Sequence, residues 1–126
     1  MPRGSTSRPD PRRALGASGE RAVAAWYEDA GYEVLDRNWR TRIGELDLVL
    51  GRDRVVVFCE VKTRRTDTFG APVEAITREK RQRLRVLAAQ WLDDHHDAVR
   101  EVRFDVASVF VRPGVEPVVE ILEGAF

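Results

Sequence analysis

Residues 44–62 read GELDLVLGRDRVVVFCEVK, two apolar runs joined by the short polar link Gly51-Arg52-Asp53. Such a link between two runs rich in Val and Leu predicts a hairpin of two strands, over 44–50 and 54–62. Consecutive apolar positions in both runs predict strands that are covered on both faces, as central strands of a layered sheet are. A turn about Asp53 would bring position 47 opposite position 58, with Glu60 as its diagonal neighbour.

The sequence on either side of this hairpin predicts two helices and three further strands. We expect a helix over 18–30, with Ser18 as its N-cap and Gly31 directly after its end. A second helix over 72–94 would begin at Pro72, a residue suited to the first turn. The three further strands are expected at 32–39, 101–111 and 117–122. The order αβββαββ predicts an α/β domain with a mixed central sheet flanked by helices.

The composition is that of one globular domain. The chain has 126 residues, of which 43% are hydrophobic and 33% charged, values typical of a single folded core. We expect residues 15–126 to form this domain and residues 1–14, rich in Pro and Arg, to form a flexible basic tail. No apolar run suggests a membrane partner or a secretory signal. A single cysteine, Cys59, excludes an internal disulfide and favours a cytoplasmic location.

Charge is balanced overall but is distributed unevenly. The chain has 21 basic and 21 acidic residues, and a net charge of zero does not by itself predict a nucleic-acid partner. Bases gather at 62–65 and 78–85 and acids at 93–97, which is compatible either with a basic face or with ordinary solvated surfaces. Only positions 62 and 80 are Lys, so a lysine at 62 is informative in a chain that otherwise uses Arg.

An acidic cluster is predicted where the central strands meet. Glu60 and Lys62 lie on one face of their strand because side chains alternate, and Asp47 would approach from the neighbouring strand. Glu20 lies on the apolar stripe of the first helix, in its expected first turn, where the helix dipole favours a carboxylate. Adjacent buried carboxylates are unfavourable unless a cation pairs with them, and hard oxygen ligands suit Mg²⁺ or Mn²⁺. The alternative is a Glu60–Lys62 ion pair at a strand end, with Asp47 as a surface acid.

The chain resembles a known family from Gly19 to about Val109. The matching segments are 19–21 (GER), 31–35 (GYEVL), 37–40 (RNWR), 44–49 (GELDLV), 57–64 (VFCEVKTR), 69–72 (FGAP), Lys80, 83–84 (RL) and 103–106 (RFDV). It is similar to the bacterial YraN-type family of predicted endonucleases. That family in turn resembles archaeal Holliday-junction resolvases of the restriction-endonuclease-like, PD-(D/E)-x-K superfamily. The resemblance implies a restriction-endonuclease-like (tRNA endonuclease-like) three-layer fold and a Mg²⁺-dependent endonuclease acting on DNA.

The resemblance also implies roles for individual residues. Asp47 and Glu60 match metal ligands, with the Val61 carbonyl as a further ligand, Glu20 matches the helix carboxylate that approaches the metal, and Lys62 matches the catalytic lysine. Expected phosphate contacts are Arg21 and Arg40 or Arg42 from the resemblance, and Arg64, Lys80 and Arg83 from the basic runs. Two symmetric cuts in a branched substrate would require a homodimer. A module that binds nucleic acid or a partner without cleaving it is the alternative function.

Other polar residues are given structural roles. Glu45 shares strand parity with Asp47 and is an alternative ligand. Asp105 is expected to pair with a nearby Arg, Cys59 to lie in the core, and His95 to lie at a solvated helix end.

Overall fold

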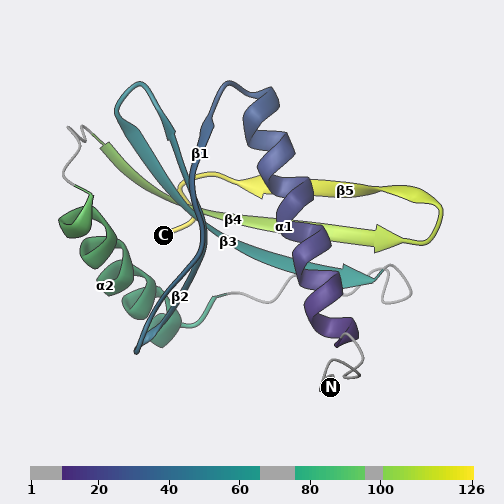
Figure 1. Cartoon of the computed structure of the whole chain (residues 1–126), viewed down its shortest axis with the longest axis horizontal. Coiled ribbons are helices and arrows are strands. Elements are labelled where there is room, and N and C mark those ends of the chain that lie inside the picture. Colours follow the sequence, from purple (N-terminus) through teal and green to yellow (C-terminus); the bar gives the residue numbers. More distant parts are fainter. Residues whose placement is uncertain (1–9, 66–75, 96–100) are drawn as a thin grey trace, which may run out of the picture.

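The structure, a computed structural model, describes residues 10–65, 76–95 and 101–126. It contains two helices and five strands in the predicted order αβββαββ (Figure 1). Their bounds are α1 (Pro11–Asp29), β1 (Glu33–Thr41), β2 (Gly44–Arg52), β3 (Val55–Arg65), α2 (Arg78–Asp94), β4 (Glu101–Arg112) and β5 (Val115–Leu122). In the described part of the chain, neither helix is long and apolar enough to cross a membrane.

The five strands form one mixed sheet in the order β1-β2-β3-β4-β5. All neighbouring pairs are antiparallel except β3 and β4, which run parallel over eleven paired positions from Val55↔Glu101 to Arg65↔Val111. A parallel pair requires a crossover, and α2 lies in the connection that makes it. The prediction of a mixed α/β sheet is confirmed.

The helices cover opposite faces of the sheet. One core cluster joins Val23, Ala24 and Tyr27 of α1 to every second residue of the central strands, namely Leu48, Leu50, Val57 and Cys59. The other joins Leu84, Leu87, Ala88 and Trp91 of α2 to the residues between them, namely Val49, Val56 and Phe58. The central strands are therefore covered on both faces, as predicted, and the domain has three layers (Figure 1).

The first helix starts earlier than predicted. Asp10 caps it by accepting a hydrogen bond from the Arg12 backbone N–H at 2.9 Å, and Pro11 is its first residue. Residues 11–14, expected in the tail, are therefore helical, and residues 1–9 lie outside the described part. Glu20 consequently lies in the middle of α1, too far from its N-terminus for the helix dipole to act on it. The predicted end is confirmed, because Gly31 follows the helix at a φ of +91°.

The second helix starts later than predicted. Thr77 is its N-cap and accepts a hydrogen bond from the Lys80 backbone N–H at 3.1 Å, so α2 begins at Arg78. Ile76 is not helical, although the apolar periodicity included it. Pro72, the expected first residue, lies outside the described residues. The side-chain cap fixes the helix start more strongly than the periodicity does.

The central hairpin is tighter than predicted, and its register is shifted by two residues. Its turn residues, Asp53 and Arg54, both have positive φ, 50° and 67°, as a two-residue type I′ turn requires. The ladder pairs Arg52 with Val55 and Leu48 with Cys59. The next positions outward are Asp47 and Glu60, so the prediction that position 47 faces position 58 is wrong. The two acids are directly opposite rather than diagonal.

A close approach of α1 to β3 at Gly19 leaves little room for a side chain. A Cβ added there would lie 1.9 Å from the Thr63 hydroxyl oxygen and 2.9 Å from its Cβ. We expect Gly19→Ala to destabilise the protein by about 1–3 kcal/mol, because overpacking outweighs the roughly 1 kcal/mol helix preference of Ala. Urea denaturation measures the change.

Gly16, on the same helix, is the matched control, because a Cβ there would have nothing within 4 Å. Gly16→Ala is expected to stabilise the protein by about 1 kcal/mol. Equal midpoints for the two variants would contradict the close packing of α1 on β3.

Candidate acidic site

Asp47 and Glu60 meet where β2 and β3 leave their regular ladder. The Asp47 carboxylate accepts a hydrogen bond from the Val61 backbone N–H at 2.9 Å, which turns its side chain toward β3. Glu60 is buried, with 7% of its surface exposed. The interpretation of Asp47 as a surface acid is wrong, because its carboxyl group lies in the protein against that of Glu60.

The electrostatics of this pair are unfavourable for two negative charges. Burial and the charges of Glu60 and Glu20 together raise the pKa of Asp47 to about 8, against the opposing effect of the hydrogen bond from Val61. Such a raised value means that the site favours either a proton or a cation on the pair. Perturbed carboxyl groups of this kind are typical of functional sites.

The cation that pairs with Glu60 is Lys80 from α2, whose ammonium group contacts the Glu60 carboxylate. The predicted alternative pair, Glu60 with Lys62, is wrong. Lys62 is half-buried two residues along β3 and forms no ion pair with a residue that the structure describes. Strand alternation leaves it on the Glu60 face.

A pocket of about 190 Å³ opens between the acid pair and α2. Its charged lining consists of Glu45, Asp47, Glu60, Lys80 and Arg83. Glu45, the alternative ligand, is held by Arg40 at 2.7 Å. Three acids therefore share one pocket with two bases, and Arg40 binds one acid from the side.

Glu20 lies in a second hollow of about 180 Å³, on the α1 side, together with Arg21, Arg37 and Asn38. It accepts a hydrogen bond from the Asn38 side-chain amide at 3.0 Å. Burial raises the pKa of Glu20, and the charges of Glu45 and Glu60 raise it further, while the Asn38 hydrogen bond acts in the opposite direction. Glu20 thus feels the acid pair electrostatically but is held by a different partner.

Only part of the predicted metal-ligand set is assembled. Among residues 10–65, 76–95 and 101–126, no three His, Cys, Asp or Glu side chains form a group that could hold a metal ion. Asp47 and Glu60 nevertheless supply hard carboxylate oxygens in a pocket, a donor chemistry that fits Mg²⁺ or Mn²⁺. The Val61 backbone N–H orients Asp47, and its carbonyl, the expected further ligand, is not used by this hydrogen bond.

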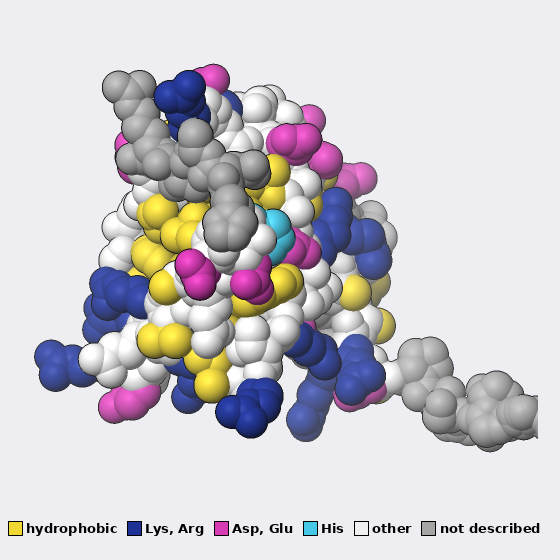
Figure 2. Space-filling model, turned by 60° about the vertical axis from the view of Figure 1, so that its left-hand side comes forward, with side chains coloured by type: hydrophobic (Ala, Val, Ile, Leu, Met, Phe, Trp, Pro, Cys, Tyr) yellow, Lys and Arg dark blue, Asp and Glu magenta, His cyan; other side chains and the backbone are white. Residues whose placement is uncertain are grey.

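The predicted phosphate-binding residues are dispersed. Arg21 is exposed on α1, Arg42 is exposed in the turn between β1 and β2, and Arg83 is exposed on α2. Arg40 is engaged with Glu45 and Lys80 with Glu60. Arg64 is half-buried near the end of β3 and already has an interaction partner. Figure 2 shows Lys and Arg side chains along the lower rim of the face on the α2 side.

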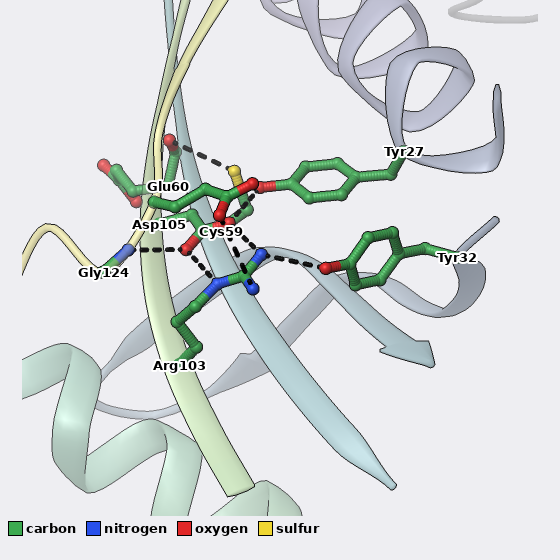
Figure 3. A network of polar contacts seen from close by, with 8 residues as sticks. Tyr27, Tyr32, Cys59, Glu60, Arg103, Asp105 and Gly124 are labelled. Carbon is green, nitrogen blue, oxygen red and sulfur yellow. Dashed lines mark hydrogen bonds and ion pairs between the residues drawn. The ribbon is translucent and has the colours of Figure 1, made fainter. Parts of the chain in front are cut away.

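Asp105 has the structural role that the sequence predicted. Its carboxylate is fully buried and accepts two hydrogen bonds from the Arg103 guanidinium, both at 2.9 Å. Tyr27 of α1 donates its hydroxyl at 2.5 Å and the Gly124 backbone N–H donates at 3.0 Å (Figure 3). The Asp105 hydrogen bonds raise the pKa of Arg103 above its usual range.

Cys59, the residue before Glu60 in β3, is buried, which confirms its predicted core position.

Sequence reasoning missed Asn38 and the contact of Lys80 with Glu60. Asn38 has a φ of +49°, a conformation that Asn adopts more readily than most residues. Nothing in the RNWR segment indicates that the Asn38 side chain points toward Glu20. For Lys80 the one signal in the sequence is the scarcity of lysine, which occurs only at positions 62 and 80.

Comparison with known proteins identifies relatives along most of the chain. The model of the uncharacterised protein family UPF0102 matches residues 19–109. A UPF0102 protein of Nocardia farcinica is 48% identical over 115 residues, covering 91% of each chain. One of Frankia alni is 52% identical over 114 residues, covering 90% of this chain and 94% of the relative. The family expected from the sequence is thus supported at the level of UPF0102.

Proposed function

Since the chain belongs to the UPF0102 family and places an acid pair at the centre of its sheet, we propose that it is a metal-dependent endonuclease. The proposed substrate is DNA, including branched DNA, and the proposed fold type is restriction-endonuclease-like. The α/β/α layering, the strand order and the position of the acids in the central hairpin support that fold type.

The observation that carries this proposal is the direct apposition of Asp47 and Glu60 in a pocket. A buried carboxylate pair is unfavourable for folding, so a protein that only needed a stable core would have apolar residues here. The pair has two oxygen-bearing groups, one fixed by the Val61 N–H and the other fixed by burial. This arrangement suits a site that binds a divalent cation.

In the proposed mechanism, Asp47 and Glu60 would hold Mg²⁺ or Mn²⁺, and the charge of Glu20 would influence the site. The metal, when bound, supplies Lewis-acid activation of the phosphodiester and of water. Val61 keeps the Asp47 carboxylate oriented through its N–H. Lys62, on the Glu60 face, orients the attacking water and stabilises the negative charge that develops on the phosphate.

Basic side chains near the site are proposed to hold the DNA backbone. Arg21 and Arg37 border the Glu20 hollow, and Arg83 borders the pocket of the acid pair. Such contacts would give an affinity that falls steeply with salt concentration. A homodimer would allow paired cuts in a branched substrate, and the unpaired Cys59 is compatible with a cytoplasmic protein.

One observation favours the second candidate, a nucleic-acid-binding or partner-binding module that does not cleave. Within the described residues Glu60 already has a cationic partner in Lys80, and the full three-acid set does not gather. A site neutralised by its own lysine is compatible with a purely structural ion pair.

Cleavage assays distinguish the two candidates. Wild-type protein is incubated with linear, single-stranded and four-way-junction DNA in Mg²⁺, Mn²⁺ or EDTA. We expect metal-dependent cleavage that falls by at least about a hundredfold in Glu60→Gln and in Lys62→Met, because each removes a group that acts in the reaction. Glu116→Gln, which neutralises an exposed acid on β5, is the matched control and should retain wild-type activity.

Cleavage that persists in EDTA, or that is unchanged in both site variants, would contradict the nuclease proposal. Salt-sensitive DNA binding without cleavage of any substrate would favour the binding module.

A further inference from the structure

Lys80 extends from α2 into the pocket of the acid pair. Its ammonium group contacts the Glu60 carboxylate and lines the same pocket as Asp47. We infer that Lys80 is a built-in counter-cation that competes with a divalent metal for Asp47 and Glu60. This inference rests on the proposed metal site and adds a regulatory contact to it.

The two partners of this ion pair differ in their freedom to move. Glu60 has 7% of its side chain exposed and is fixed in the sheet, whereas the Lys80 side chain is 38% exposed. A lysine has a long flexible stem that can carry its charge into water. Displacement of Lys80 therefore leaves no buried unpaired ammonium, while displacement of Glu60 would disrupt the strand.

The position of Lys80 at the start of α2 would also allow its ammonium group to leave Glu60 without moving the backbone. Its backbone N–H is held by the Thr77 side chain at 3.1 Å, so the backbone position is fixed while the ammonium group remains free to swing. The ammonium keeps Glu60 neutralised in the absence of metal. An incoming cation must replace that interaction, which lowers its apparent affinity.

Arg83 provides a matched comparison on the same helix. It lines the same pocket but forms no ion pair with a residue in the described part of the chain. Arg83→Gln removes one positive charge from the pocket without removing a partner of Glu60. Lys80→Gln removes both the charge and the direct competitor.

Metal affinity is the direct test. Calorimetric titration of the full chain with Mn²⁺ is carried out on wild type, Lys80→Gln and Arg83→Gln. Removing a contacting opposite charge leaves the carboxylate pair free to attract another cation, so we expect Lys80→Gln to bind Mn²⁺ at least about tenfold more tightly than wild type. Arg83→Gln should change the affinity by less than about threefold, because its charge is more exposed and more screened.

A second measurement uses wild-type protein, so it does not depend on the folding of a variant. The chain has only two lysines, at positions 62 and 80, and mass spectrometry can resolve the acetylation of each. Saturating Mn²⁺ should accelerate the acetylation of Lys80 by releasing its ammonium group from Glu60. Buffer with EDTA gives the reference rate, and acetylation of free Nα-acetyl-lysine in the same two buffers corrects for any general effect of the metal on the reagent.

The outcomes separate this inference from the proposed function. If wild type binds Mn²⁺ but Lys80→Gln binds it equally or more weakly, or if Lys80 acetylation does not accelerate, competition by Lys80 is wrong and the metal site stands. If none of the three proteins binds Mn²⁺, both the metal site and the competition are wrong. Tight binding by Lys80→Gln alone would support the competition.

Discussion

Asp47→Asn is expected to make the metal-free protein more stable at pH 8, by about 2–4 kcal/mol, although it removes a group proposed to hold metal. The amide oxygen of Asn can still accept the Val61 hydrogen bond that Asp47 accepts at 2.9 Å. Its amide N–H can donate toward Glu60, so a repulsive contact between two carboxyl groups becomes an attractive one. Stability and the proposed function therefore oppose each other at this position.

The direction follows from proton linkage. Burial, Glu60 and Glu20 raise the pKa of Asp47 from 3.8 to about 8, so between these values the folded state binds more protons than the unfolded state. The contribution of Asp47 to stability is therefore complete below pH 4 and is lost as the pH rises through about 8. Lys80 and Arg83 line the same pocket from α2, and positive charges favour an ionised carboxylate, but the net shift in the pKa of Asp47 is upward.

Urea denaturation at several pH values between 5 and 8.5, in EDTA, measures this difference. The free energy of unfolding of wild type should fall across this range more steeply than that of Asp47→Asn. Asp53→Asn, in the exposed hairpin turn, serves as the control and should follow the wild-type slope. Parallel curves for wild type and Asp47→Asn would show that Asp47 is ionised in the folded protein without strain.

Asp105→Ala should produce the largest loss of stability, about 3–5 kcal/mol, because it breaks a buried ion pair and leaves its partners unsatisfied. The Arg103 guanidinium, the Tyr27 hydroxyl and the Gly124 backbone N–H all lose their acceptor at once. These three groups come from β4, α1 and the residues after β5, so the change loosens three elements (Figure 3).

Thermal and urea denaturation measure this loss, and Tyr27→Phe separates one contact from the rest. Tyr27→Phe removes only one donor and should cost about 1–2 kcal/mol. Asp93→Ala, which removes an exposed carboxylate on α2, should stay within about 0.5 kcal/mol of wild type. A loss for Asp105→Ala no greater than that for Tyr27→Phe would mean that Arg103 finds another partner.

The sequence predicted the fold well where the signal is local. Consecutive apolar residues at 55–58 and a short polar link predicted central paired strands, and both are present. The predicted register was wrong by two residues because the turn consists of Asp53 and Arg54 with positive φ, without the Gly that usually marks such a turn. The helix starts were wrong because the capping side chains lie where the apolar periodicity is uninformative.

The site was predictable only in part. Asp47 and Glu60 stand out as acids within apolar strands, so their meeting could be expected from strand pairing. The Lys80 contact could not, because it depends on how α2 packs across the sheet, a tertiary property that spacing along the chain does not contain. The hydrogen bond from Asn38 to Glu20 could not be predicted either, because Asn38 adopts a positive φ that the sequence does not indicate.

The hydrogen bond between Tyr27 and Asp105 joins residues 78 positions apart, and this separation affects how the chain folds. Closing so long a loop costs chain entropy before any contact offsets that cost. The parallel pairing of β3 with β4 is also slow, because the crossover between them must be ordered first. The β2–β3 hairpin, whose contacts are local, can form much earlier. The buried network around Asp105 is therefore expected to form late in folding, after the central strands have paired. Interactions that form late stabilise a protein mainly by slowing its unfolding.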